Sequence, residues 1–134
     1  MSSSDQISTG VVLLAVIGIA YGGTFLLRVV SGKAPANHLQ KTYFRAGHAH
    51  AGVLVILGLV VRLLLDQATV PDWSSRLANL VLFAAILMPA GFFLSVIGRD
   101  LQRPNRFRYL LAAGGILLVV GLAAAGTGLI LGAV

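Results

Sequence analysis

The chain has 134 residues, of which 57% are hydrophobic and 10% charged, with a formal net charge of +6, no cysteine and a mean hydropathy of +0.92. Soluble domains carry about a quarter of their residues as Asp, Glu, Lys or Arg, so this composition excludes a water-soluble fold with one small core. The lack of cysteine excludes disulfides and thiolate metal sites, and the placement of the basic residues in short connections favours anionic lipid over nucleic acid.

Four long runs without Asp, Glu, Lys or Arg predict four membrane-spanning helices. A helix that crosses the hydrocarbon core needs about 20 mainly apolar residues. No segment alternates polar and apolar residues as a membrane β-strand does. We therefore predict an all-α integral membrane protein, a four-helix transmembrane bundle that forms a single domain over residues 1–134. The expected helices cover residues 8–30, 46–65, 76–98 and 108–132.

The first predicted helix, 8–30, is expected to remain in the mature protein. No Lys or Arg precedes it, and its apolar run is too long for a cleavable signal. Gly18 and Gly22 lie on one face, and small residues mark the places where membrane helices approach closely. We expect this face to contact another helix.

The second predicted helix, 46–65, begins with two histidines, His48 and His50. Ionisable groups in membrane segments are uncommon, and histidine can bind a metal or haem iron or pass protons. In a regular helix, residues two apart point in directions about 200° apart, so the two rings cannot share one ion. His50 lies nearer the side of Gly58 and is expected to point into the bundle.

Two other readings of this segment stay open. If the helix begins after His50, both imidazoles can bind one ion, with His38 as a third ligand. Alternatively, both residues are interfacial and hydrogen-bond loop carbonyls, Tyr43 or lipid phosphate. Arg62, further along this helix, is expected to form an exposed pair with Asp66 at the membrane surface.

The third predicted helix, 76–98, contains Pro89, which should kink it because proline removes a helical hydrogen bond. Asn79 is its polar residue, and a hydrogen bond to a neighbouring helix is the expected role of such a side chain. Trp73 precedes the helix and suits the membrane interface, where indole rings settle.

The fourth predicted helix, 108–132, has a face of small residues that predicts close packing. This face contains Gly114, Gly121, Gly128 and Gly132. A compact bundle with this helix deeply packed is the simpler interpretation, and a homodimer seam or a groove for a partner helix is the alternative.

The connections between the helices predict the orientation. Lys and Arg concentrate in the first and third connections, and such residues favour the cytoplasmic side. Both termini are therefore expected outside the cytoplasm, in a plasma or inner membrane. Arg103, Arg106 and Arg108 in the third connection are expected to contact anionic lipid.

The sequence contains no nucleophile elbow, phosphate-binding glycine loop or metalloprotease motif, so no enzyme class is indicated. The leading hypothesis is an accessory or scaffolding subunit of a membrane complex, since the soluble portion is very small and several helix faces are lined by glycine. A protein that binds haem or a transition metal through His48 and His50 is the second hypothesis. A small oligomeric transporter or channel, suggested by Pro89 and Asn79, is the third.

Overall fold

The computed structural model describes residues 3–133, and over this range the chain forms helices and no strand. Four helical segments are long and apolar enough to cross a membrane, as predicted. The third of these segments consists of α3 and α4, which follow each other directly. The elements are α1 (Ser3–Val30), α2 (His38–Asp66), α3 (Asp72–Ala78), α4 (Leu80–Ser95), the 3₁₀ turn η1 (Arg106–Arg108) and α5 (Tyr109–Leu131).

The helix α2 begins at His38, well ahead of the expected residue 46. A capping box fixes this start: Asn37 Oδ1 accepts a hydrogen bond from Gln40 N at 2.9 Å, and Gln40 Oε1 accepts one from Asn37 N at 3.1 Å. These bonds satisfy two backbone N–H groups at the helix end. The first turns of α2 therefore lie outside the apolar run, and these turns contain charged residues.

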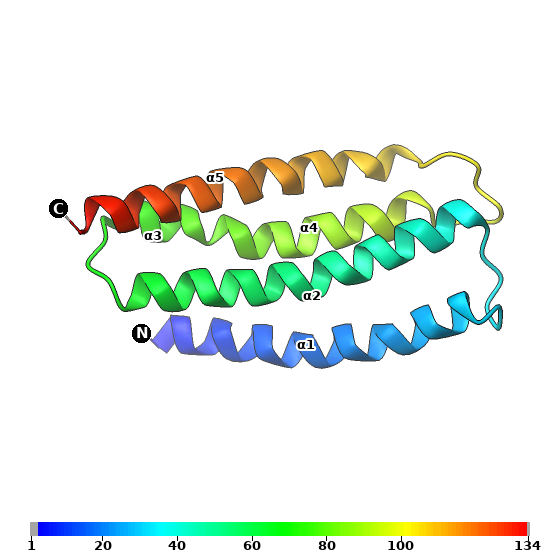
Figure 1. Cartoon of the computed structure of the whole chain (residues 1–134), viewed down its shortest axis with the longest axis horizontal. Helices are drawn as coiled ribbons and strands as arrows, with labels where there is room; N and C mark the ends of the chain where they lie inside the picture. The colour runs from blue at the N-terminus through cyan, green and yellow to red at the C-terminus, as the bar shows by residue number, and fades with distance from the viewer. Residues whose placement is uncertain (1–2, 134) are drawn as a thin grey trace.

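The four long segments run alternately in opposite directions and lie in the order α1, α2, α4, α5, with both ends of the chain on the same side (Figure 1). The helix α4 packs against both α2 and α5, and α3 packs mainly against α5. Among the described elements, α1 approaches only α2 closely. The helix α1 is therefore peripheral, and its most apolar window contains no buried residue.

The buried side chains form two clusters between the helices. One cluster joins α2, α3 and α5 near the chain termini and contains Val61, Leu65, Ala78 and Ala125. The other joins α2 and α4 and contains Leu54, Val55 and Ala85, with Val12 and Ile19 of α1 packed against it. The interior is formed by α2 to α5, and α1 contributes only its edge.

The glycine face of α5 packs within the chain. A Cβ atom added at Gly121 would lie 2.8 Å from Val81 Cγ2, and one added at Gly114 would lie 3.0 Å from the backbone N of Met88. Gly128 is in direct contact with the side chain of Ser74, and Gly132 with the backbone of Thr69. The hydroxyl of Ser74, which is fully buried, donates to the carbonyl of Ala124 at 2.9 Å.

The predicted glycines of the other helices have different surroundings. Gly58 of α2 contacts Leu82 of α4, and Gly22 of α1 contacts the ring of His48. A Cβ at Gly18 would meet no atom within 4 Å among residues 3–133, so this side of the residue does not pack against another described helix. The contact edge of α1 passes through Ile19, and an adjacent residue of a helix points about 100° away.

The third of the segments long enough to cross a membrane is interrupted at Asn79, which ends α3 and precedes α4. The helix α4 continues through Pro89, which is buried. Asn79 therefore lies at a helix junction near the chain termini, not within a continuous helix as expected from the sequence. Its side chain is exposed and faces a cavity described below.

The two connections at the other end are joined by hydrogen bonds. The buried Gln40 donates through Nε2 to the carbonyls of Val96 and Gly98, at 3.0 and 2.9 Å. Asn37 donates through Nδ2 to the carbonyl of Leu101 at 2.8 Å. Gly98 has a φ of 140°, a conformation that side chains disfavour. This end of the molecule is held by side-chain to backbone bonds between residues far apart in sequence.

Candidate functional site

The two histidines of α2 point to different helices. His48 is half-buried and packs against α1: a Cβ added at Gly23 would lie 3.5 Å from both Cε1 and Nε2 of its ring. His50 faces α4, where its ring centroid is 4.9 Å from that of Phe92. Both residues are helical, so the proposed shared ion site with a helix starting after His50 is wrong.

His38 is also distant from the other two imidazoles. It is the exposed first residue of α2, and ten residues of helix separate it from His48, about 15 Å along the axis. Over residues 3–133 there is no group of three or more His, Cys, Asp or Glu residues that could hold a metal ion. The structure therefore gives no support to the haem or metal hypothesis.

The surroundings of His50 indicate a packed, hydrogen-bonded residue. Its Nδ1 lies 2.8 Å from the carbonyl oxygen of Ala46, so Nδ1 bears a proton and donates it to this bond. Beside it lies an aromatic cluster that links α1, α2 and α4, with ring centroids 5.5 to 5.7 Å apart. The cluster consists of Phe25, Tyr43, Phe44, Phe92 and Phe93. These contacts give His50 a role in packing α2 against α4.

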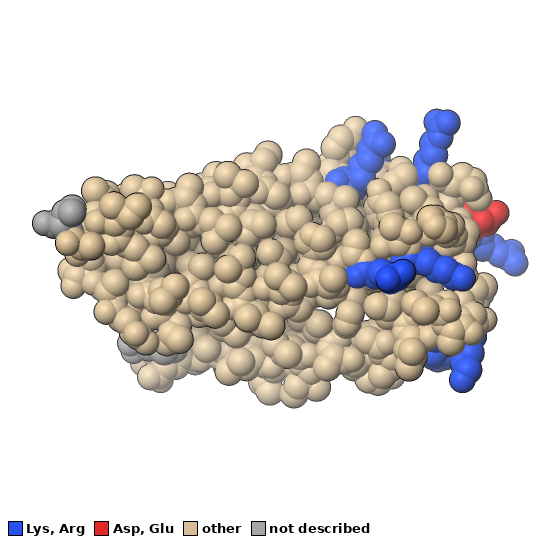
Figure 2. Space-filling model, in the orientation of Figure 1, with Lys and Arg blue, Asp and Glu red and all other residues tan. Residues whose placement is uncertain are grey.

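Basic residues gather at one end of the molecule, where the α1–α2 and α4–η1 connections lie (Figure 2). All but two of the 10 Lys and Arg residues belong to these connections or the helix turns next to them. Arg103, Arg106 and Arg108 are exposed there, and the guanidinium of Arg108 lies 5.4 Å from the ring centroid of Tyr109. This asymmetry provides a surface suited to anionic headgroups.

A second polar site lies at the opposite end, around Arg62 of α2. Its guanidinium forms an ion pair with Asp5 of α1 and donates to Ser8 Oγ at 2.7 Å. The side chain of Arg62 is only 17% exposed, so it is not the exposed residue expected from the sequence. Asp5 was not predicted as its partner, because the two residues are far apart in the chain. The only sequence signal is that Asp5 precedes the first apolar run and Arg62 follows the second, so two antiparallel helices would place both charges at the same end of the bundle.

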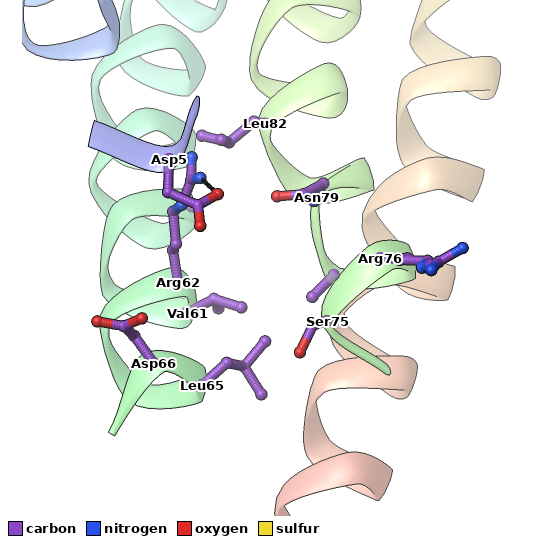
Figure 3. Close-up of a pocket in the computed structure, with 11 residues that line it drawn as sticks. Asp5, Val61, Arg62, Leu65, Asp66, Ser75, Arg76, Asn79 and Leu82 are labelled. Carbon is purple, nitrogen blue, oxygen red and sulfur yellow. Dashed lines mark hydrogen bonds and ion pairs between the residues drawn. The ribbon is translucent and has the colours of Figure 1, made fainter. Parts of the chain in front are cut away.

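We call the hollow beside this ion pair the Arg62 crevice (Figure 3). It lies between α2 and the α3–α4 junction, and its volume is about 300 Å³. An adjoining cavity of about 410 Å³ extends from Arg62 between α1 and α4. The residues that line the crevice are Asp5, Gly58, Val61, Arg62, Leu65, Asp66, Ser75, Arg76, Ala78, Asn79 and Leu82.

The chain matches no protein-family model, no curated protein and no solved structure in the comparisons made. Function is therefore inferred from the residues and contacts of this chain alone. Two features offer a basis for it: the peripheral position of α1 and the polar crevice beside Arg62.

Proposed function

We propose that this protein is an accessory or scaffolding subunit of a larger membrane complex, in a plasma or inner membrane. The observation that supports this role is the one-sided packing of α1. Its outer face is apolar and exposed over the whole span, with Ile17 66% and Tyr21 77% exposed. Gly10 and Gly18 face open space and would let a partner helix approach closely.

The form of the rest of the molecule agrees with such a role. The described chain consists almost wholly of membrane-length helices, and the connections between them are short. No soluble domain large enough for an active site of its own is formed by residues 3–133. Binding through a membrane helix is the function that this architecture serves most directly.

Photo-crosslinking in the native membrane tests the proposal. We would place the photoreactive residue p-benzoylphenylalanine at Ile17 of α1 and, as a control, at Ile116 of α5. These two isoleucines have similar exposure, 66% and 63%. We expect Ile17 to give a protein adduct of defined mass, with a different protein as the partner, and Ile116 to give only lipid adducts. Lipid adducts alone at both positions, or a self-adduct alone at Ile17, would contradict the proposed role.

We also propose that both termini lie outside the cytoplasm. The basic end of the molecule and the end that carries the termini are opposite, and Lys and Arg favour the cytoplasmic side. Alkaline phosphatase fused after residue 134 should be active, while the same enzyme inserted in the α4–η1 connection should be inactive. The reverse pattern would refute the orientation without affecting the helical fold.

A further inference from the structure

We propose that the Arg62 crevice binds one zwitterionic phospholipid, with its headgroup among the charged residues and an acyl chain along α4. The site differs from the α1 face of the proposed partner contact. It is also separate from the basic end, where anionic lipid is expected.

The shape of the crevice fits an amphiphile. The part near α3 is polar, with Ser75 and Asn79 in its wall (Figure 3). The adjoining cavity continues down α4 along Leu82, Phe83 and Ile86, which are apolar. Together they give a polar head region above an apolar groove, and each has a volume in the range of small-ligand sites.

The charges that line the crevice favour a headgroup of both signs. The charged groups at the crevice wall are Arg62 and Asp5, which form a neutral ion pair, because the charged ends of Arg76 and Asp66 point away from the hollow (Figure 3). A purely anionic headgroup would face the Asp5 carboxylate, and a purely cationic one would face the Arg62 guanidinium. A phosphate paired with an ammonium group satisfies both sets of charges.

Two side chains are placed to hydrogen-bond such a headgroup. The ion pair with Asp5 and the bond to Ser8 hold the Arg62 guanidinium in a fixed orientation at the cavity wall. The carboxamide of Asn79 lies at the opposite wall, and within the described chain it makes no hydrogen bond (Figure 3). It can therefore donate to a phosphate or ester oxygen and accept from an ammonium group.

The depth of the crevice matches the headgroup region. It lies at the end of the apolar spans, next to the start of the third span at Asp72. Trp73, which is 45% exposed, lies in the first turn of this span, and tryptophan is enriched at the membrane interface. Phe83 and Ile86, about one and two turns deeper than Asn79, are 55% and 65% exposed and face the acyl-chain region.

Native mass spectrometry of the purified full chain tests this inference. The protein would be reconstituted with equal amounts of phosphatidylethanolamine and phosphatidylglycerol, then extracted in mild detergent. We expect one phosphatidylethanolamine to be retained per chain. Removal of the hydrogen-bonding group in Asn79→Leu should lower this retention by about fivefold.

Two arginine variants locate the bound lipid. Arg62→Met removes the cation at the crevice wall and should also reduce phosphatidylethanolamine retention. Arg103→Met, at the basic end, should leave it unchanged and lower phosphatidylglycerol retention instead. Circular dichroism and gel-filtration profiles equal to those of the wild type would show that the variants fold.

Three outcomes would overturn the proposal. These are equal retention of both lipids by the wild type, retention unaffected by both Asn79→Leu and Arg62→Met, or equal losses in Arg62→Met and Arg103→Met. None of them bears on the partner contact of α1, so the two proposals fail or stand separately.

Discussion

Substitution of Gly121 by alanine should destabilise the contact between α4 and α5. The added Cβ would lie 2.8 Å from Val81 Cγ2 and 3.0 Å from the backbone N of Val81, while carbon atoms pack favourably at about 3.5–4.0 Å. Val81 is fully buried and its backbone belongs to α4, so the side chain cannot move aside. The two helices must separate, and overpacking of this kind costs about 1–3 kcal/mol.

A matched control is available on the same helix. Gly126→Ala adds the same methyl group where no described atom lies within 4 Å. Both substitutions gain the higher helix propensity of alanine, about 1 kcal/mol, so their difference isolates the contact. Unfolding of the purified protein in mixed micelles of mild detergent and SDS would measure the free energy of unfolding. Equal values for the two variants would refute the packing of Gly121 against Val81.

Three further predictions concern other contacts. Gln40→Leu leaves two carbonyls of the α4–η1 connection without their hydrogen-bond donor. It should lower the free energy of unfolding by about 1–3 kcal/mol in the same assay. An unchanged free energy would show that these two hydrogen bonds do not stabilise the fold. A double-mutant cycle with Asp5→Asn and Arg62→Gln should give a coupling energy of about 1 kcal/mol or less, because the Asp5 side chain is 41% exposed; additive effects would indicate no coupling. His48→Ala removes the ring that packs against Gly22 and Gly23 of α1. The rate of amide hydrogen exchange should therefore rise in α1 and stay constant in α5. A rise in both helices would indicate global destabilisation instead.

The four apolar helices could be predicted from the positions of the charged residues, because these divide the chain into four long charge-free runs, each about as long as a membrane-spanning helix. The face of α5 that contains Gly114 and Gly121 was also visible as a periodic pattern, and the structure places it against α4. Periodicity does not tell which helix lies opposite a glycine face, so the choice between contacts within and between chains required the structure.

Features that depend on long-range contacts were not predictable. The pairing of Asp5 with Arg62 joins residues from two helices, and each residue alone resembles an ordinary charge near a helix end. The start of α2 was missed for a different reason. Hydropathy marks the lipid-facing part of a helix, whereas the Asn37 and Gln40 capping box sets where the helix begins. That signal was present in the sequence and could have been used.

The interruption at Asn79 was also not predicted. Its neighbours on both sides are good helix formers, and no proline or glycine marks the junction. The junction brings the Asn79 carboxamide to the Arg62 crevice, so the main features of this candidate site arise from tertiary structure.

The peripheral position of α1 has a consequence for biogenesis. Because α1 precedes α2 in synthesis, it enters the bilayer before the only helix that it contacts closely in the described chain. The buried residues of both core clusters belong to α2, α3, α4 and α5, and α1 adds only Val12 and Ile19 at the edge of one of them. The order of synthesis and the depth of packing therefore differ: α1 is made before the other described helices, yet it packs only at the edge of the core that they form.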